Sequence, residues 1–272
     1  MFGALLALAA CSPARILNAT IARGGLTITH DVAYGPDPRQ KLDIYRPEGD
    51  GKLPVVMFFY GGSWKMGSKA MYPFVAATLA RQGNVVVVPD YRLYPQVRYP
   101  VFLEDCARAT AWAAAHFRQI GGAGRRLFLM GHSAGAYNAA MLALNPAYLA
   151  AAGLPRERVA GLIGLAGPYD FHPSTDPDVH QVFAPSPDAP TQPTTYADSQ
   201  APPALLLAGG ADETVKPRNT RALADRLGGR AMVRVYPGVG HIGLIIAIAP
   251  VFQGKAPVLA DIEAFIAAHP TN

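Results

Sequence analysis

The feature that most constrains this chain is an apolar run that meets a glycine-flanked serine and then a helix-forming stretch. Residues 127–130 read Leu-Phe-Leu-Met, and the pentapeptide 131–135 reads Gly-His-Ser-Ala-Gly before an alanine-rich segment. This order predicts a strand, a tight turn and a helix, with Ser133 on a strained turn that holds its hydroxyl clear of the backbone. Gly131 and Gly135 suit a place where strand and helix cross closely. The alternative is an ordinary turn with no reactive serine. Catalytic partners for Ser133 elsewhere in the sequence would distinguish the two interpretations.

The length and composition predict one globular domain. The chain has 272 residues, of which 50% are hydrophobic and 16% charged, enough for one large core and unlike a disordered chain. The net charge is +5, but the arginines are scattered and Arg125-Arg126 is the one tight pair, so we expect no nucleic-acid partner. Internal repeats are absent, and no internal apolar run is long enough to span a bilayer.

The first 25 residues predict a targeting segment and a linker ahead of one globular domain at 26–272. Residues 8–11, Leu-Ala-Ala-Cys, resemble the lipobox of bacterial lipoproteins, which would make Cys11 a lipidated membrane anchor in the cell envelope. No Lys or Arg precedes the short apolar run, so a frayed helix on a cytoplasmic protein is the alternative. Cys106, the other cysteine, lies in helical sequence, and we expect a buried thiol there and no disulfide.

The pattern of apolar runs predicts an α/β fold. The first two strands alternate polar and apolar residues and flank a turn, as expected of an antiparallel pair at a sheet edge, and the later runs are continuously apolar, as in a parallel sheet covered by helices on both faces. We expect a sheet of about eight mostly parallel strands, with reactive groups at their carboxyl ends. The expected strands are 26–34, 41–45, 53–60, 84–88, 127–130, 159–165, 204–208 and 232–236, and the expected helices are 70–81, 101–117, one from 134 to about 145, 220–227 and 258–268.

One long segment, 168–203, has no sustained helical or strand-like spacing of apolar residues and is rich in Pro, Thr, Ser and Asp. Loops of this length in a compact domain are usually functional, so we expect a small lid over the site, with a disordered excursion as the alternative. Its His172, Asp176, Asp178 and His180 have ligand chemistry, but their irregular spacing favours a solvated loop. We expect neither a metal nor a cofactor.

A serine nucleophile needs a base to take its proton and a third group to orient that base. Asp212 follows the predicted strand 204–208, and His241 follows the last strand. The carboxyl ends of parallel strands share one edge, so Ser133, Asp212 and His241 are expected to meet there.

Three neighbouring residues are alternatives for these roles. Glu213 would face away from Asp212 on the turn, and Asp170 follows an earlier strand, so we favour Asp212 as the acid. His132 precedes Ser133, but its side chain should diverge from that of Ser133, which favours packing or lining of the site.

Acyl transfer also needs donors aimed at the developing oxyanion. The backbone N–H of Ala134 opens the helix after Ser133. Gly61 and Gly62 follow the third strand, and their lack of side chains lets backbone N–H groups approach a ligand, although a plain turn would also use them.

Together, residues 60–64 (Tyr-Gly-Gly-Ser-Trp), 89–93 (Pro-Asp-Tyr-Arg-Leu), 131–135, Asp212 and His241 resemble the α/β-hydrolase serine esterases. The likeness is to the hormone-sensitive-lipase and carboxylesterase-like group, including arylformamidase-like and feruloyl-esterase-like branches. It extends from about residue 28 to the end and implies the α/β-hydrolase fold.

The resemblance also implies the role of each site residue. It makes Ser133 the nucleophile, His241 the general base and acid, Asp212 its orienter, and Gly61, Gly62 and Ala134 the oxyanion donors. Tyr60 departs from the pattern, because the group usually has His before the two glycines, and its phenol could hydrogen-bond within the site instead.

The expected function is therefore a serine carboxylesterase acting on short-chain or aryl esters of small molecules. An acetyl or feruloyl polysaccharide esterase and an arylformamidase are the alternatives. A non-catalytic interaction module is a further one, but such proteins usually lack a member of the triad. We expect the substrate-binding residues to be Tyr60, Trp64, Tyr91, His132, Tyr169, Phe171 and Ile242.

Overall fold

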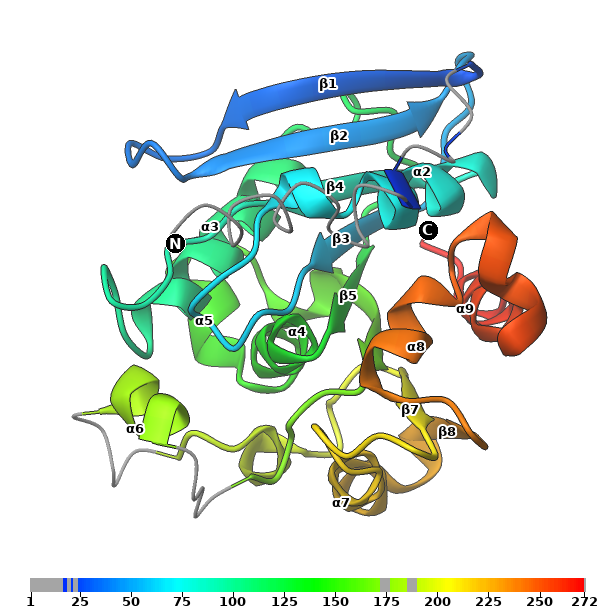
Figure 1. The fold of residues 1–272 in the computed structure, drawn as a ribbon. Coiled ribbons are helices and arrows are strands. Elements are labelled where there is room, and N and C mark those ends of the chain that lie inside the picture. Colours follow the sequence, from blue (N-terminus) through cyan, green and yellow to red (C-terminus); the bar gives the residue numbers. More distant parts are fainter. Residues whose placement is uncertain (1–16, 19–20, 22–23, 172–176, 185–189, 272) are drawn as a thin grey trace, which may run out of the picture.

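The computed structural model describes residues 17–18, 21, 24–171, 177–184 and 190–271. In this part of the chain, eight strands form one sheet in the order β1-β2-β4-β3-β5-β6-β7-β8 (Figure 1). β1 and β2 pair antiparallel, β2 pairs antiparallel with β4, and the remaining neighbours are parallel. The predicted α/β fold with an antiparallel start is confirmed. The strands are β1 Leu26–Ala33, β2 Lys41–Pro47, β3 Val55–Phe59, β4 Val85–Pro89, β5 Leu127–His132, β6 Val159–Leu165, β7 Ala204–Gly209 and β8 Ala231–Tyr236.

The two edges of the sheet differ from its centre. Every residue of β3 to β7 is buried, as their apolar runs predict, whereas β1 is mostly exposed and β8 alternates. The pairing of β1 with β2 shifts register between Thr29 and Val32, and Asp31 in that bulge has φ 58°. A bulge and polar side chains on an edge strand discourage pairing with another chain.

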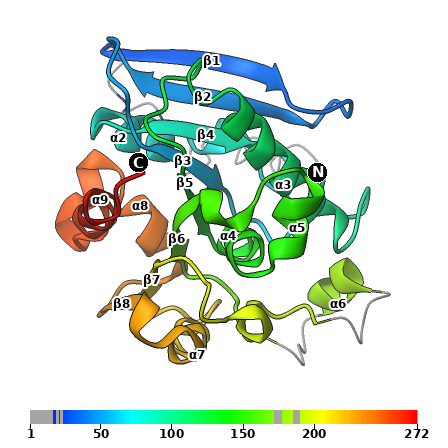
Figure 2. The same cartoon turned by 180° about the vertical axis from the view of Figure 1, so that it is seen from behind.

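Helices cover both faces of the sheet, as Figures 1 and 2 show from opposite sides. α2 (Pro73–Arg81) and α9 (Val258–Ala268) lie on one face, and α3 (Val101–Ala115), α4 (Ala134–Leu144) and α5 (Pro146–Ala151) lie on the other. α4 is buried along all its residues, because its alanines let it fit between the sheet and the outer helices. None of the helices described is both long and apolar enough to cross a membrane.

The structure contains helices that the sequence pattern did not predict. α4 ends at Leu144, close to the expected 145, and Pro146 then opens the unpredicted α5, which Asn145 caps by accepting a hydrogen bond from the Ala147 amide at 3.1 Å. His241 follows the last strand as expected, but it begins a helix that was not predicted, α8 (His241–Ile246). The segment 168–203 contains α6 (Pro177–Phe183), a short 3₁₀ turn, Pro193–Tyr196, and no strand in its described residues. α7 (Arg218–Leu227) matches the expected helix at 220–227 closely.

A carboxylate lies in a cavity between α9 and the start of β4. Glu263 accepts hydrogen bonds from Asn84 Nδ2 at 3.1 and 3.2 Å, and both residues line a space of about 320 Å³. Burial raises the pKa of Glu263 to about 7, which the hydrogen bond from Asn84 opposes in part. The folded protein therefore holds the proton more tightly than the unfolded chain.

Because the folded pKa of Glu263 is raised, its stabilising contribution should be complete below the unfolded value and should disappear as the pH rises through 7. Glu263→Gln stays neutral and should gain on the order of 1 kcal/mol over the unsubstituted protein between pH 5 and pH 8.5, after allowance for solvent screening. Urea unfolding at both pH values measures this. An equal difference between the two proteins at both pH values would contradict it.

Candidate active site

Ser133 lies on a strained turn between β5 and α4. Its backbone has φ 55° and ψ −125°, a conformation that costs a non-glycine residue about 1–3 kcal/mol. A Cβ on Gly131 would lie 2.2 Å from the Gly135 carbonyl oxygen, and a Cβ on Gly135 would lie 2.0 Å from that of Phe59. Both glycines are therefore required by the close crossing of strand and helix, as predicted.

Asp212 and His241 meet at the carboxyl ends of β7 and β8. Asp212 Oδ2 lies 2.7 Å from His241 Nδ1, and Asp212 Oδ1 accepts hydrogen bonds from the amides of Thr214 at 2.9 Å and Val215 at 2.8 Å. The carboxylate is buried and held on both oxygens. With Nδ1 engaged, the free Nε2 of His241 is the nitrogen able to exchange a proton.

The two other candidate acids lie apart from His241. Glu213 is exposed and pairs with Lys216 at 3.3 Å. Asp170 is also exposed, and its amide donates to Asn219 Oδ1 at 3.1 Å. Of the three carboxylates considered, Asp212 is the one that contacts the imidazole.

His132 connects the serine turn to the loop of His241. Its ring lies 4.8 Å from the His241 ring, centroid to centroid, and its Nε2 lies 3.2 Å from the His241 carbonyl oxygen. A carbonyl only accepts, so His132 Nε2 carries the proton and donates it. The buried Nδ1 has no partner among the described residues. His132 thus packs against His241, as the sequence favoured, and does not reach Ser133.

Burial, followed by the nearby charge of His241, lowers the pKa of His132 to about 3. We expect His132 to remain neutral, protonated on Nε2, from pH 8 down to pH 5. Imidazole spectra of protein labelled with ¹⁵N-histidine report both the tautomer and the titration, and His132→Gln assigns the signals. A titration midpoint above pH 5, or a proton on Nδ1, would contradict this assignment.

The predicted oxyanion loop lies against Ser133. A Cβ on Gly61 would approach Ser133 Cβ to 2.9 Å, so the Gly61 backbone touches the serine turn. Gly62 has φ 130°, and its carbonyl accepts from the amides of Lys65 and Met66, each at 3.0 Å. Ala134 is the first residue of α4, where helix amides have no partner within the helix. The Gly61 backbone and the first residue of α4 therefore lie on either side of Ser133, and Gly62 is next along the loop.

The Ser133 hydroxyl makes no capping hydrogen bond to α4, and it has no hydrogen bond to His241 in the described part of the chain. Ser133 as a residue is half-buried. Hydrogen bonds between nucleophile and base are often long before a substrate binds. This separation therefore does not conflict with a nucleophilic role.

Tyr60 requires a correction, because it was expected to bind substrate. Its side chain is fully buried, and its hydroxyl donates to Asp90 Oδ1 at 2.8 Å, behind the loop that Gly61 opens. The phenol therefore does not reach the site surface. Arg39 and Asp90, which contact it, were not among the predicted site residues. Asp90 lies in a motif that was used only for the resemblance, and Arg39 lies in a turn with no distinguishing pattern.

Three other predicted pocket walls are also buried. Tyr91 donates its hydroxyl to the Tyr60 carbonyl at 2.7 Å, and Trp64 donates Nε1 to Asn138 Oδ1 at 2.9 Å. Tyr169 is fully buried, and its hydroxyl has no partner among the described residues. In this conformation these aromatic rings belong to the core and do not line a substrate surface.

The remaining predicted walls are accessible. Phe171 is half-buried and stacks on Trp64 with 6.2 Å between the ring centroids. Ile242 is 58% exposed beside His241. Met66, which was not predicted, is 67% exposed on the oxyanion loop. Exposed apolar side chains therefore flank both the loop and the base.

The segment 168–203 packs on the aromatic core through α6. The Phe183 ring lies 5.0 Å from the Trp64 ring and 5.4 Å from that of Phe171, centroid to centroid. His172, Asp176 and the Asp178 side chain lie outside the described residues, as does Cys11, whereas His180 is exposed on α6. The described residues contain no group of three or more His, Cys, Asp or Glu that could hold a metal.

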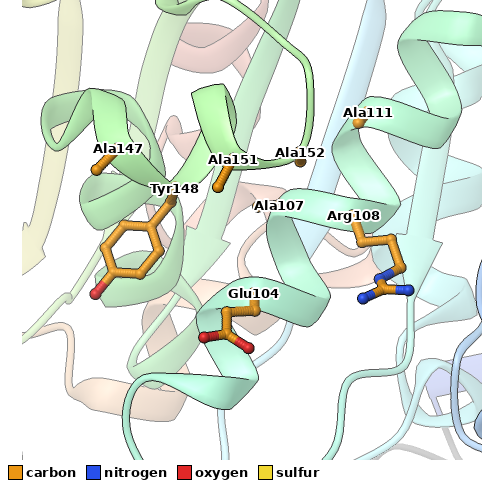
Figure 3. A pocket seen from close by; sticks show the side chains of 8 residues that line it. All are labelled: Glu104, Ala107, Arg108, Ala111, Ala147, Tyr148, Ala151 and Ala152. Carbon is orange, nitrogen blue, oxygen red and sulfur yellow. The ribbon is translucent and has the colours of Figure 1, made fainter.

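A cavity of about 610 Å³ lies elsewhere, between α3 and α5 (Figure 3). Its polar groups are Glu104, Arg108 and Tyr148, and the Tyr148 hydroxyl lies 3.0 Å from that of Tyr99. No predicted site residue lines it. The lining residues are Glu104, Ala107, Arg108, Ala111, Ala147, Tyr148, Ala151 and Ala152.

Solved esterases share this fold. Esterase B from Lactobacillus rhamnosis has a TM-score of 0.78 at 18% identity, over 96% of this chain and 92% of its own. An esterase from the archaeon Pyrobaculum calidifontis has a TM-score of 0.76 at 23% identity, over 95% of this chain and 91% of its own. At these identities the likeness shows the α/β-hydrolase fold.

Sequence relatives place the chain among esterases. Esterase LipC of Mycobacterium tuberculosis is 31% identical over 77% of this chain and 58% of its own length. Isoprenylcysteine alpha-carbonyl methylesterase ICME of Arabidopsis thaliana is 27% identical over 88% of this chain and 62% of its own. The chain thus spans about three-fifths of these relatives. The BD-FAE family model matches residues 42–227, which include β2 to α7, so this chain is an α/β-hydrolase that belongs to the BD-FAE family.

Proposed function

We propose that this chain is a serine carboxylesterase with Ser133 as nucleophile, His241 as general base and acid, and Asp212 as the residue that orients His241. The observation that carries the proposal is the 2.7 Å contact between Asp212 and His241 at the sheet edge where Ser133 lies on its strained turn. The relatives that are named as esterases support it, and so does the match to the BD-FAE family model.

In the proposed reaction, Ser133 Oγ attacks the ester carbonyl carbon while His241 Nε2 takes the hydroxyl proton. The carbonyl oxygen becomes an oxyanion, which accepts hydrogen bonds from the backbone N–H groups of Gly61, Gly62 and Ala134. Collapse of this intermediate breaks the bond to the alcohol oxygen, which takes the proton from His241. An acyl group then remains on Ser133.

The second half repeats these steps with water. His241 Nε2 removes a proton from water, the hydroxide attacks the acyl carbon, and the proton returns to Ser133 as the acid leaves. Asp212 keeps the imidazole in the tautomer with Nδ1–H and stabilises the imidazolium. The amides of Thr214 and Val215 hold the carboxylate still during both proton transfers.

The walls near the site support short-chain or aryl esters as substrates. Met66 and Ile242 are exposed beside the reacting groups, whereas the buried Trp64 ring is already covered by Phe183 of α6, with 5.0 Å between the ring centroids. A compact apolar acyl or aryl group can contact Met66 and Ile242. A long acyl chain would need space that the Trp64 and Phe183 rings already occupy.

Ser133→Ala should lower kcat by at least about 10³-fold, and Asp212→Asn by about 10³–10⁴-fold, because each removes one part of a unit that acts together. Hydrolysis of p-nitrophenyl acetate measures both. Labelling by a fluorophosphonate should be lost in Ser133→Ala and kept in Ser199→Ala, a control at an exposed serine. Full labelling of Ser133→Ala would rule out the assigned nucleophile.

A p-nitrophenyl series from acetyl to palmitoyl should show the highest kcat/KM at short acyl chains, because the aromatic rings around Trp64 and Phe183 occupy the space that a long chain needs. Fastest turnover of the palmitoyl ester would overturn this preference. Release of acetate from acetylated xylan, compared with release from phenyl acetate, tests the polysaccharide alternative, and hydrolysis of N-formylkynurenine tests the formamidase alternative.

A further inference from the structure

The loop 60–69 carries the two glycines of the proposed oxyanion site. Its first residue, Tyr60, is held by hydrogen bonds from its side chain to Arg39 and Asp90. The Tyr60 hydroxyl donates to Asp90 Oδ1 at 2.8 Å and accepts from Arg39 Nη2 at 2.9 Å. The phenol that makes both contacts is fully buried. Arg39, Tyr60 and Asp90 are called the loop-anchoring network below.

Arg39 and Asp90 also hold the far end of the loop. Arg39 Nη2 donates to the Gly67 carbonyl, and its Nε donates to the Tyr91 carbonyl at 2.7 Å. Asp90 Oδ1 accepts from the Lys69 amide at 2.7 Å. One guanidinium and one carboxylate therefore bind the two ends of the same loop, and a lysine at position 39 has no planar fork with which to reach these acceptors together.

The Tyr60 ring is also fixed in orientation. It stacks between Tyr91 and Tyr72, with centroids at 4.8 and 5.7 Å, and the Tyr91 hydroxyl donates to the Tyr60 carbonyl at 2.7 Å. That carbonyl belongs to the peptide that carries the Gly61 N–H. Tyr91, whose hydroxyl fixes the orientation of this peptide plane, is fully buried.

The position of this peptide matters because the Gly61 backbone touches Ser133. An oxyanion donor acts only when it is aimed at the oxygen of the intermediate, and displacement of about 1 Å can cost a hundredfold in rate. We propose, resting on the proposed esterase function, that Arg39, Tyr60 and Asp90 are positioning residues that hold the Gly61-Gly62 backbone in the geometry needed to stabilise the oxyanion.

Tyr60→Phe removes the hydroxyl and keeps the stacked ring, so it tests the network with little change in packing. Tyr236→Phe is a matched control, because the Tyr236 hydroxyl also donates to a carboxylate, Asp261 Oδ2 at 2.7 Å, but on β8 at the opposite edge from β1. Both variants lose a tyrosine–aspartate hydrogen bond and should lose similar stability. Only Tyr60→Phe loosens the oxyanion loop.

Tyr60→Phe should lower kcat for p-nitrophenyl acetate by about tenfold or more, a fraction of the loss of a whole donor, and leave KM within about twofold. Affinity for a trifluoromethyl ketone, which forms an oxyanion on Ser133, should fall by a similar factor. Tyr236→Phe should change neither quantity. A kcat in Tyr60→Phe equal to that of Tyr236→Phe, or KM and kcat/KM altered with kcat unchanged, would overturn the proposal.

Arg39→Lys provides a second variant at a partly exposed position, so the proposal stays testable if Tyr60→Phe does not fold. It should show the same loss of kcat and of ketone affinity, and wild-type values would overturn the proposal. The fluorophosphonate endpoint should remain one label per chain in every variant. Failure of the esterase function itself looks different, because the unsubstituted protein would then hydrolyse no ester and take no label.

Discussion

The whole site depends on the close approach of α4 to the sheet at Gly135. The helix passes so near to β3 that a methyl group there would overlap the Phe59 carbonyl oxygen. This approach brings the start of the helix beside the end of β3, where Gly61 lies, and keeps Ser133 in a backbone conformation that a free chain would leave. Burial of α4 along its full length offsets the free-energy cost of that conformation. Packing of the core therefore keeps the turn at Ser133 in place.

Around this crossing, each group that we propose to react is held by hydrogen bonds from neighbouring residues. Asp212 is fixed by two amides of its own turn, and His241 is held by Asp212 on its ring and by His132 on its carbonyl. The oxyanion loop is held through Tyr60. Such preorganisation means that hydrogen-bond donors need little rearrangement when negative charge develops on a substrate oxygen.

The sequence allowed the sheet, its antiparallel edge and the placement of Ser133, Asp212 and His241 to be predicted, because each depends on a local pattern: an apolar run followed by a turn. It did not show that four of the predicted pocket walls, Tyr60, Trp64, Tyr91 and Tyr169, are buried. Trp64 lies directly beyond the glycines, but its backbone has φ 56°, and its side chain turns inward to Asn138. The spacing of apolar residues and the composition of the sequence do not determine the direction of the Trp64 side chain. Nor do they encode the pairing of Tyr60 with Arg39, which joins two segments 21 residues apart through a turn.

The hairpin of β1 and β2 lies at the rim of the sheet, where strands open most readily. Yet Arg39 comes from its turn, and Asp31 and Asp43 from its strands bind Lys69 Nζ at 2.8 and 2.6 Å, at the end of the oxyanion loop. On the proposed role of Arg39, the smallest fragment with an intact site includes this outer hairpin, although the hairpin supplies none of Ser133, Asp212 and His241. A fragment reduced to the parallel strands would keep Ser133, Asp212 and His241. It would lose Arg39 and the two aspartates that bind Lys69, and with them the contacts at both ends of the oxyanion loop.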